Sequence, residues 1–212
     1  MQIAIPLFDR VTALDAVGPY EVLQRLPGAT VVFVGAEVGR VRTENGFLGL
    51  EVDATFADVP SPDVIVVPGG VGTRALMTPN PLLEWISAVH PTTTFTTSVC
   101  TGSLLLGAAG LLNGLTATTH WGAYEALRNV GAIPTGQRVV EHLDERIITA
   151  AGVSSGIDMA LRLSELLVDA TAAMAMQVMI EYDPQPPFDA GSVDKAGPVV
   201  MARVAQYAAT KK

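Results

Sequence analysis

Short apolar runs alternate with segments of helical spacing along this chain, and this alternation limits the fold more than any other feature. The apolar runs are rich in β-branched residues and are bounded by glycine, proline or polar turns, as expected of buried strands. Four such strands are predicted over residues 2–7, 30–35, 64–67 and 94–97. Because these strands are apolar on both faces, they predict a mostly parallel sheet covered by helices on both sides. The expected fold class is therefore α/β, a three-layer sandwich.

Helical spacing and turn signals complete the predicted order of elements. Helices are predicted over residues 19–26, 80–89, 101–109, 121–130 and 154–168. Two hairpins are predicted as well, one with strands 40–43 and 47–52 around Glu44-Asn45-Gly46, and one with strands 138–141 and 147–150.

The end of the chain differs in composition from the rest. Prolines at positions 184, 186, 187 and 198 exclude regular structure over residues 182–198. We expect one α/β domain over residues 1–181. Residues 182–212 would form a proline-rich extension and a C-terminal helix, packed on the same domain or on a dimer partner.

Composition excludes several classes of protein. The 212 residues are 49% hydrophobic and only 16% charged, with a formal net charge of −8 and three lysines. This balance excludes a disordered chain and argues against binding to nucleic acid or to an anionic membrane surface. The longest stretch without charged residues, 85–124, contains proline, asparagine and several glycines, so a membrane-spanning helix is not expected.

The cysteine and histidine content limits the chemistry further. A single cysteine, Cys100, excludes a disulfide within the chain, and three scattered histidines with no second cysteine argue against a zinc site. The N-terminus lacks a basic region and carries Pro6, unlike a signal peptide. We therefore expect a cytoplasmic protein without a zinc site.

Cys100 is the first candidate for chemistry. A predicted strand leads to it and a predicted helix leaves it, with Gly102 allowing close packing, which is the pattern of a nucleophile elbow. A cysteine at a helix N-terminus also experiences the helix dipole, which favours the thiolate. The alternative is a small buried hydrophobic residue with no chemical role.

Asp15 is the second candidate, because it follows the first strand and precedes a helix. Its apolar neighbours favour a partly buried carboxyl group with a raised pKa. The alternative is a helix cap or turn residue. If the first and fourth strands are neighbours, Asp15 and Cys100 lie at the same edge of the sheet, where ligands bind in open α/β folds.

The loop Gly69-Gly70-Val71-Gly72 follows the third strand and exposes backbone N–H groups without bulky side chains. Gly70 and Val71 are therefore expected to bind substrate or a developing negative charge. The loop also fits a loose dinucleotide fingerprint, but no acidic residue follows at the required distance of about 20 positions.

His120 precedes Trp121 and could act as the base or acid of a Cys–His pair with Cys100, or could simply be hydrogen-bonded at a helix start. His90 and His142 lie in surface-like contexts and receive no role.

These motifs together resemble the DJ-1/PfpI superfamily, and within it the isonitrile hydratases. The resemblance spans nearly the whole chain. It rests on residues 14–23, 66–70, 98–102, 117–121 and 151–158, and most specifically on the tail, 180–192. Val193 stands where this family is expected to have proline, which is a change in a loop.

The resemblance implies a flavodoxin-like sandwich, a homodimer and a nucleophilic Cys100. PfpI-type proteases have histidine where this chain has Thr101, and DJ-1-type deglycases and glyoxalases have glutamate where it has Asp15. Both differences point to the hydratases, with Cys100, Asp15 and Thr101 as catalytic residues and with Gly70, Val71 and His120 contacting substrate.

The implied reaction is the hydration of an isonitrile to an N-substituted formamide through a thioimidate on Cys100, with Asp15 supplying a proton. This reaction is expected to need neither a metal nor an organic cofactor. Three alternatives stay open. They are another thiol-dependent enzyme of the glyoxalase, deglycase or hydrolase type, a cysteine redox sensor without enzymatic activity, and the ligand-sensing domain of an AraC-type regulator.

Overall fold

The computed structural model describes residues 1–210, so the last two residues of the expected extension, Lys211 and Lys212, lie outside it. Contacts between residues divide the chain into two units, Met1–Ile180 and Glu181–Lys212. The first unit holds the sheet and its covering helices and is described first.

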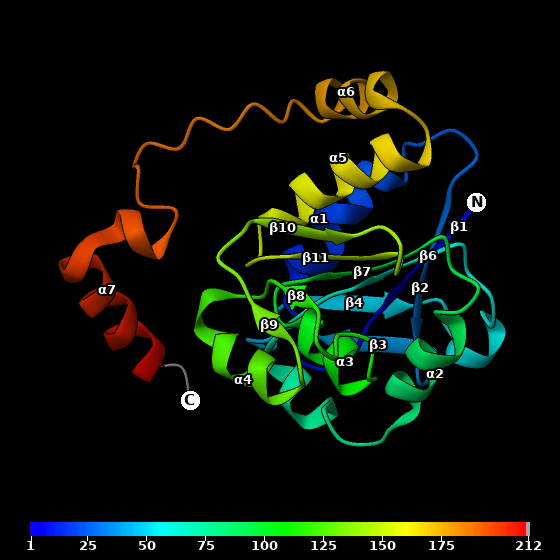
Figure 1. Ribbon diagram of the computed structural model, residues 1–212, viewed down its shortest axis with the longest axis horizontal. Coiled ribbons are helices and arrows are strands. Elements are labelled where there is room, and N and C mark those ends of the chain that lie inside the picture. The colour runs from blue at the N-terminus through cyan, green and yellow to red at the C-terminus, as the bar shows by residue number, and fades with distance from the viewer. Residues whose placement is uncertain (211–212) are drawn as a thin grey trace. The chain divides into compact units, whose positions relative to one another are not determined.

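A seven-stranded sheet forms the centre of the first unit (Figure 1). The strand order is β10-β11-β7-β6-β1-β2-β5, and every pairing is parallel except that of β10 with β11. This is the flavodoxin-like order predicted for the class. The strands are β1 (Gln2–Pro6), β2 (Thr30–Gly35), β5 (Ala54–Thr55), β6 (Val64–Val67), β7 (Phe95–Val99), β10 (Val139–His142) and β11 (Ile147–Ala150).

Helices cover both faces of this sheet, as the apolar strands predict (Figure 1). One apolar core lies between the sheet and α2, α3 and α4, and the other lies between the sheet and α1, α5 and α6. The helices of this unit are α1 (Ala13–Leu23), α2 (Pro81–Val89), α3 (Gly102–Ala108), α4 (Tyr124–Asn129), α5 (Ser155–Leu167) and α6 (Ala170–Met179). The three-layer sandwich is therefore confirmed.

Helix α1 begins six residues earlier than predicted. The helical spacing was predicted only from Pro19 onward. In the structure Pro19 lies inside α1, where it is fully buried beside Gly156 of α5. The contacts between α1 and α5 outweigh the lost backbone hydrogen bond, and the longer helix places Asp15 in its first turn.

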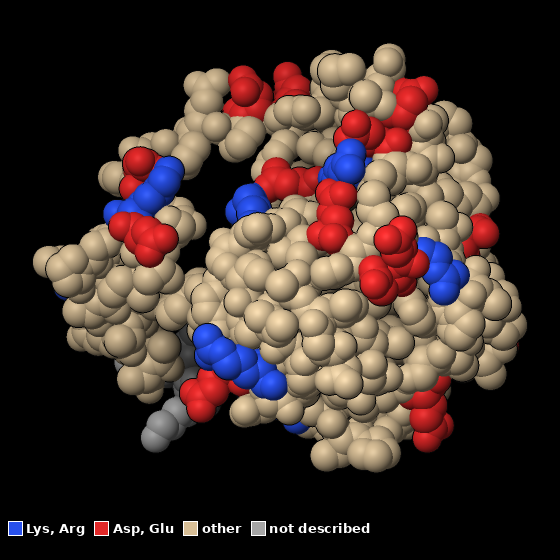
Figure 2. Space-filling model, in the orientation of Figure 1, with Lys and Arg blue, Asp and Glu red and all other residues tan. Residues whose placement is uncertain are grey.

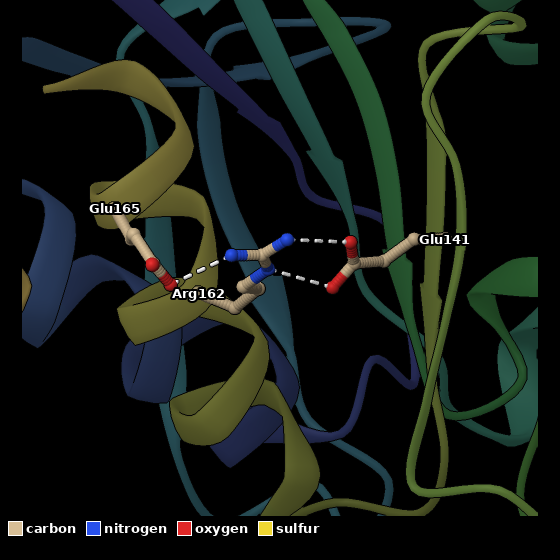
Figure 3. A network of polar contacts seen from close by, with 3 residues as sticks. All are labelled: Glu141, Arg162 and Glu165. Atoms are coloured by element: carbon tan, nitrogen blue, oxygen red, sulfur yellow. Dashed lines mark hydrogen bonds and ion pairs between the residues drawn. The ribbon is translucent and has the colours of Figure 1, made fainter. Parts of the chain in front are cut away.

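Helix α5 is fixed to the edge of the sheet by ion pairs (Figure 3). The Arg162 guanidinium donates to both carboxylate oxygens of Glu141 on β10, at 2.8 and 3.0 Å, and to Glu165 one turn along α5 at 2.7 Å. These contacts raise the pKa of Arg162 further above its usual value, chiefly through its hydrogen bonds with Glu141. The pairing holds α5 in register with the only antiparallel strand of the described sheet.

Several smaller elements surround the sandwich. The predicted hairpin is confirmed as β3 (Gly39–Arg42) and β4 (Gly49–Val52), which pair antiparallel in a sheet of their own. Helix α6 and a second two-stranded sheet, β8 (Thr116–Ala117) with β9 (Ile133–Pro134), were not predicted. Three 3₁₀ helices, η1 (Phe56–Asp58), η2 (Val71–Leu76) and η3 (Trp121–Ala123), complete the unit.

The second unit contains α7 (Val193–Thr210), and this helix begins earlier than the sequence predicts. Regular structure was excluded up to Pro198, but helical turns start at Val193. Gly197 adopts φ 70° and ψ 169° and interrupts the helix, so that Pro198 begins the next helical segment, where its ring is tolerated.

In the described part of the chain, no helix is both long enough and apolar enough to cross a membrane. Figure 2 shows that, on one face, basic side chains stand singly or beside acidic ones, without a continuous basic surface.

Candidate active site

Three loops meet at the carboxyl ends of neighbouring strands and form the candidate site. Asp15 follows β1, Gly69 and Gly70 follow β6, and Cys100 follows β7. The condition that β1 and β7 be neighbours is not met, because β6 lies between them. The two side chains instead converge over the loop that follows β6. This position is the topological switch point, where ligands bind in sheets of this type.

The backbone at Cys100 forms the predicted sharp turn from strand to helix. Cys100 has a φ of 56°, which is unusual for a residue with a side chain. Its N–H donates to the carbonyls of Ala150 and Ala151 at 3.1 and 2.9 Å. Its own carbonyl accepts from Ser103 Oγ at 3.1 Å and Thr119 Oγ1 at 2.9 Å. This web of bonds holds a strained residue in place, and strain of this kind is common at active sites.

The glycine after the elbow is required by close packing. A Cβ atom at Gly102 would lie 2.1 Å from the Val67 carbonyl oxygen at the end of β6. Only glycine therefore permits α3 to start this close to the sheet. Cys100 itself is buried, with 5% of its surface exposed.

Asp15 is fully buried, and its two carboxylate oxygens differ in their surroundings. Oδ2 accepts a hydrogen bond from the Gly69 N–H at 3.0 Å. Oδ1 is buried and has no nitrogen or oxygen partner in the described chain. Burial raises the pKa of Asp15 from 3.8 to about 7, against the lowering effects of the Gly69 N–H and of a hydrogen bond with the Cys100 thiol. The raised pKa agrees with the prediction for this residue.

The pKa of Cys100 is raised, although the position of this residue before a helix predicted a lowered value. Burial, and then the charge of Asp15, raise the pKa of Cys100 to about 12. Hydrogen bonds from the backbone of Val153 and Thr101 act in the opposite direction but do not offset these two causes. The helix-dipole argument was therefore wrong, because α3 is short and loss of solvation dominates. Cys100 and Asp15 form a coupled pair that holds two protons below about pH 7 and one proton above it.

Thr101 links the nucleophile to the glycine loop. Its Oγ1 accepts from the Gly70 N–H at 2.9 Å and lies 3.3 Å from Thr73 Oγ1. The Gly70 carbonyl also accepts from Thr73 Oγ1 at 2.8 Å and from Arg74 Nη1 at 3.2 Å. The Gly70 N–H expected to meet a developing charge therefore already has a partner. The following N–H, that of Val71 at the start of η2, faces the Arg10 carbonyl in the antiparallel bridge that pairs Gly70 with Val11.

His120 lies beside the site without pairing with the thiol. Its Nδ1 accepts from the Gly122 N–H at 3.2 Å, so the ring's proton belongs on Nε2. Burial, and then the charge of Arg74, lower the pKa of His120, so the ring is neutral at pH 7. Among residues 1–210, no hydrogen bond joins His120 to Cys100, and it is Thr119 that contacts the cysteine.

Three residues of the site were not identified from the sequence. Thr73 and Arg74 hold the Gly70 carbonyl, and the Val153 N–H reaches the Cys100 sulfur. Val153 follows β11 at the same edge of the sheet, but nothing in the local sequence pattern distinguished it. No cluster of His, Cys, Asp and Glu suited to a metal ion occurs in the part of the chain that the structure describes.

Comparison with known proteins places this arrangement in a family. Residues 1–166 match the DJ-1/PfpI family. An isonitrile hydratase of Pseudomonas putida is 44% identical over 209 residues, which cover 99% of this chain and 90% of that protein. The HTH-type transcriptional regulator CdhR of Pseudomonas aeruginosa is 28% identical over 162 residues, covering 75% of this chain but 47% of the regulator.

A solved structure shares the whole architecture. A THiJ/PfpI family protein from Pseudomonas syringae superposes with a TM-score of 0.91 at 39% identity, covering 99% of this chain and 87% of that one. Together with the elbow at Cys100 and the loop at Gly70, these similarities show that the chain belongs to the DJ-1/PfpI family.

Proposed function

We propose that this protein is an isonitrile hydratase that converts isonitriles to N-substituted formamides through a thioimidate on Cys100. The observation that carries the proposal is the buried Asp15 carboxyl, which has a free Oδ1 and shares a proton with the Cys100 thiol. The 44% identity with the hydratase of Pseudomonas putida over almost the full length supports the choice of substrate class.

The first step needs one nucleophile and one proton, and the pair supplies both. The Cys100 sulfur attacks the terminal carbon of the isonitrile while the proton held by the pair is delivered to that carbon by Asp15. A carbon–sulfur bond and a carbon–hydrogen bond form, and the product is a neutral thioimidate. Asp15 is then an unprotonated carboxylate.

The second step consumes water. Asp15 accepts one proton from a water molecule as the water oxygen adds to the thioimidate carbon, and it passes this proton to the nitrogen. Collapse of this adduct breaks the carbon–sulfur bond, releases the formamide and returns one proton to the pair. Atoms balance as isonitrile plus water gives formamide, without an oxidant or reductant.

The surrounding groups have positioning roles in this proposal. Thr101 fixes the glycine loop through Gly70, and the backbone of Gly70 and Val71 would border the polar end of the intermediate. His120 is neutral and borders the substrate. A low-charge, buried centre suits a neutral and mostly apolar substrate.

The proposal extends to assembly and location. We infer a homodimer, which would provide a surface for the extension over residues 182–212, and we infer a cytoplasmic enzyme, consistent with a single free cysteine. Sedimentation at micromolar concentration tests the first inference, and a monomer there would refute it.

The direct test is incubation of the enzyme with cyclohexyl isonitrile, followed by NMR detection of N-cyclohexylformamide. We expect catalytic turnover by the natural chain and none by Cys100→Ala, because no other residue can form the thioimidate. Substantial formamide production by Cys100→Ala would refute the covalent mechanism. Absence of turnover by the natural chain would favour a sensor or another thiol-dependent reaction.

A further inference from the structure

A cavity lies at the same end of the sheet as the candidate active site, beside the carboxyl ends of β1 and β2. It has a volume of about 340 Å³ and is bordered by the residues that follow β1 and β2, by the hairpin β3–β4 and by the start of α2. The volume matches a small ligand. Cys100, Asp15 and Thr101 do not line it, so it is separate from the proposed catalytic centre.

The walls of this cavity are mostly apolar. Phe8, Val52 and Leu82 are buried side chains of its lining. Phe56 adds a second aromatic ring, held in place by stacking on Trp85 with ring centroids 5.1 Å apart. Such walls bind the apolar body of a ligand.

The lining has more acidic than basic residues. Asp9 and Glu37 are exposed, which places them at the mouth, and neither forms an ion pair within residues 1–210. The only cationic side chain of the lining, Arg40, is paired with Glu51 at 2.7 Å. Two exposed acidic residues therefore belong to the lining without an ion-pair partner among the described residues.

We infer that this cavity binds a small organic cation, an ammonium group with an apolar substituent. The ammonium would lie between Asp9 and Glu37, and the substituent would enter the apolar interior beside Phe8 and Phe56. The faces of these rings also attract a cation. An anionic ligand would meet two carboxylates, and a neutral one would leave them without a partner.

Calorimetric titration of the full-length protein tests this inference, with benzylammonium as the probe and benzyl alcohol as its uncharged counterpart. We expect benzylammonium to bind one site per chain at least about fivefold more tightly than the alcohol. Asp9→Asn and Glu37→Gln should each weaken binding about threefold to fivefold, and the double variant about tenfold, as expected for exposed carboxylates. Because both positions are exposed, these variants should fold normally.

Two controls locate the binding. Glu145→Gln removes the same charge from the exposed turn before β11, at the opposite end of the sheet, and should leave the affinity unchanged. Cys100→Ala should also bind benzylammonium normally. The inference is overturned if benzylammonium does not bind, if the alcohol binds equally well, if the Asp9 and Glu37 variants bind like the natural chain, or if Cys100→Ala abolishes binding.

Discussion

Two buried polar clusters lie at opposite ends of β7, and they are built differently. At the carboxyl end, Asp15 keeps one oxygen without a nitrogen or oxygen partner beside the Cys100 thiol. At the amino end, Thr96 Oγ1 lies 2.9 Å from both His90 Nδ1 and Thr93 Oγ1. Thr93 Oγ1 also donates to the His90 carbonyl at 3.0 Å. We call His90, Thr93 and Thr96 the amino-end cluster.

The difference separates groups that stabilise the fold from groups that are available for chemistry. Each side chain of the amino-end cluster has a hydrogen-bond partner, which is the usual state of buried polar groups. A buried carboxyl with a free oxygen costs stability. Its raised pKa makes it useful as a proton donor near neutral pH. Mutations at the two ends should therefore have opposite effects on activity and stability.

The largest effect is expected from Asp15, measured as the rate of formamide formation. Asp15→Asn keeps the volume but cannot carry the shared proton, and Asp15→Glu pushes the carboxyl into the space of the thiol. Each variant should lose at least about 10²-fold in kcat. If Asp15 proves dispensable and His120 essential, the site works as a Cys–His pair, and a hydrolase-type reaction replaces the proposed hydration.

The same Asp15→Asn change should stabilise the protein at neutral pH. The folded-state pKa of Asp15, about 7, lies above the unfolded value of 3.8. The free energy of unfolding therefore falls as pH rises from about 4 to 7, because the carboxyl ionises more easily in the unfolded chain. Removing the ionisation should raise the free energy of unfolding at pH 8 by on the order of 2 kcal/mol. Urea denaturation at pH 5 and pH 8 measures this, and a variant less stable than the natural chain at pH 8 contradicts the expectation.

Thr96→Val should do the reverse. It leaves His90 Nδ1 and one Thr93 contact unpaired inside the protein, which should lower the free energy of unfolding by about 1–2 kcal/mol. Because Thr96 lies at the other end of β7, kcat should stay within about twofold of that of the natural chain, a change that corresponds to less than 1 kcal/mol. A loss of kcat comparable to that of Asp15→Asn would show that the two clusters do not act separately.

The smallest effect on catalysis is expected from His120→Ala. The ring is neutral, its Nδ1 is occupied by the Gly122 N–H, and it does not hydrogen-bond Cys100. A loss of less than about tenfold in kcat is expected, below the usual contribution of a general acid or base. Steady-state measurement of kcat for His120→Ala and Asp15→Asn under the same conditions compares the two residues directly.

Sequence patterns predicted the sheet well because buried parallel strands have a simple composition. Runs such as 64–67 are apolar on both faces, and few other structures need that pattern. The start of α1 was missed because proline is disfavoured inside a helix, and only the packing of Pro19 against α5 accounts for its internal position. Helix α6 was missed although Asp169 at its N-cap is a local signal, because only Met176 is buried and the apolar residues do not gather on one face.

The candidate site was predictable in its members but not in its electrostatics. Cys100, Asp15 and the glycine loop follow neighbouring strands, so their convergence follows from topology. The pKa of Cys100 depends on burial and on the distance to Asp15, and neither quantity is local in sequence. The hydrogen bond of the Gly70 N–H could not be predicted either, because its partner, Thr101, lies 31 residues away in the sequence.

The pH dependence of kcat/KM for an isonitrile tests the central claim, that Cys100 and Asp15 act as a pair with one shared proton. The doubly protonated pair lacks a thiolate, so kcat/KM should rise as pH increases through about 7 and then level off. Asp15→Asn should remove this transition along with most of the rate. A transition that persists in Asp15→Asn, or that follows an ordinary thiol near pH 8–9, would contradict the account.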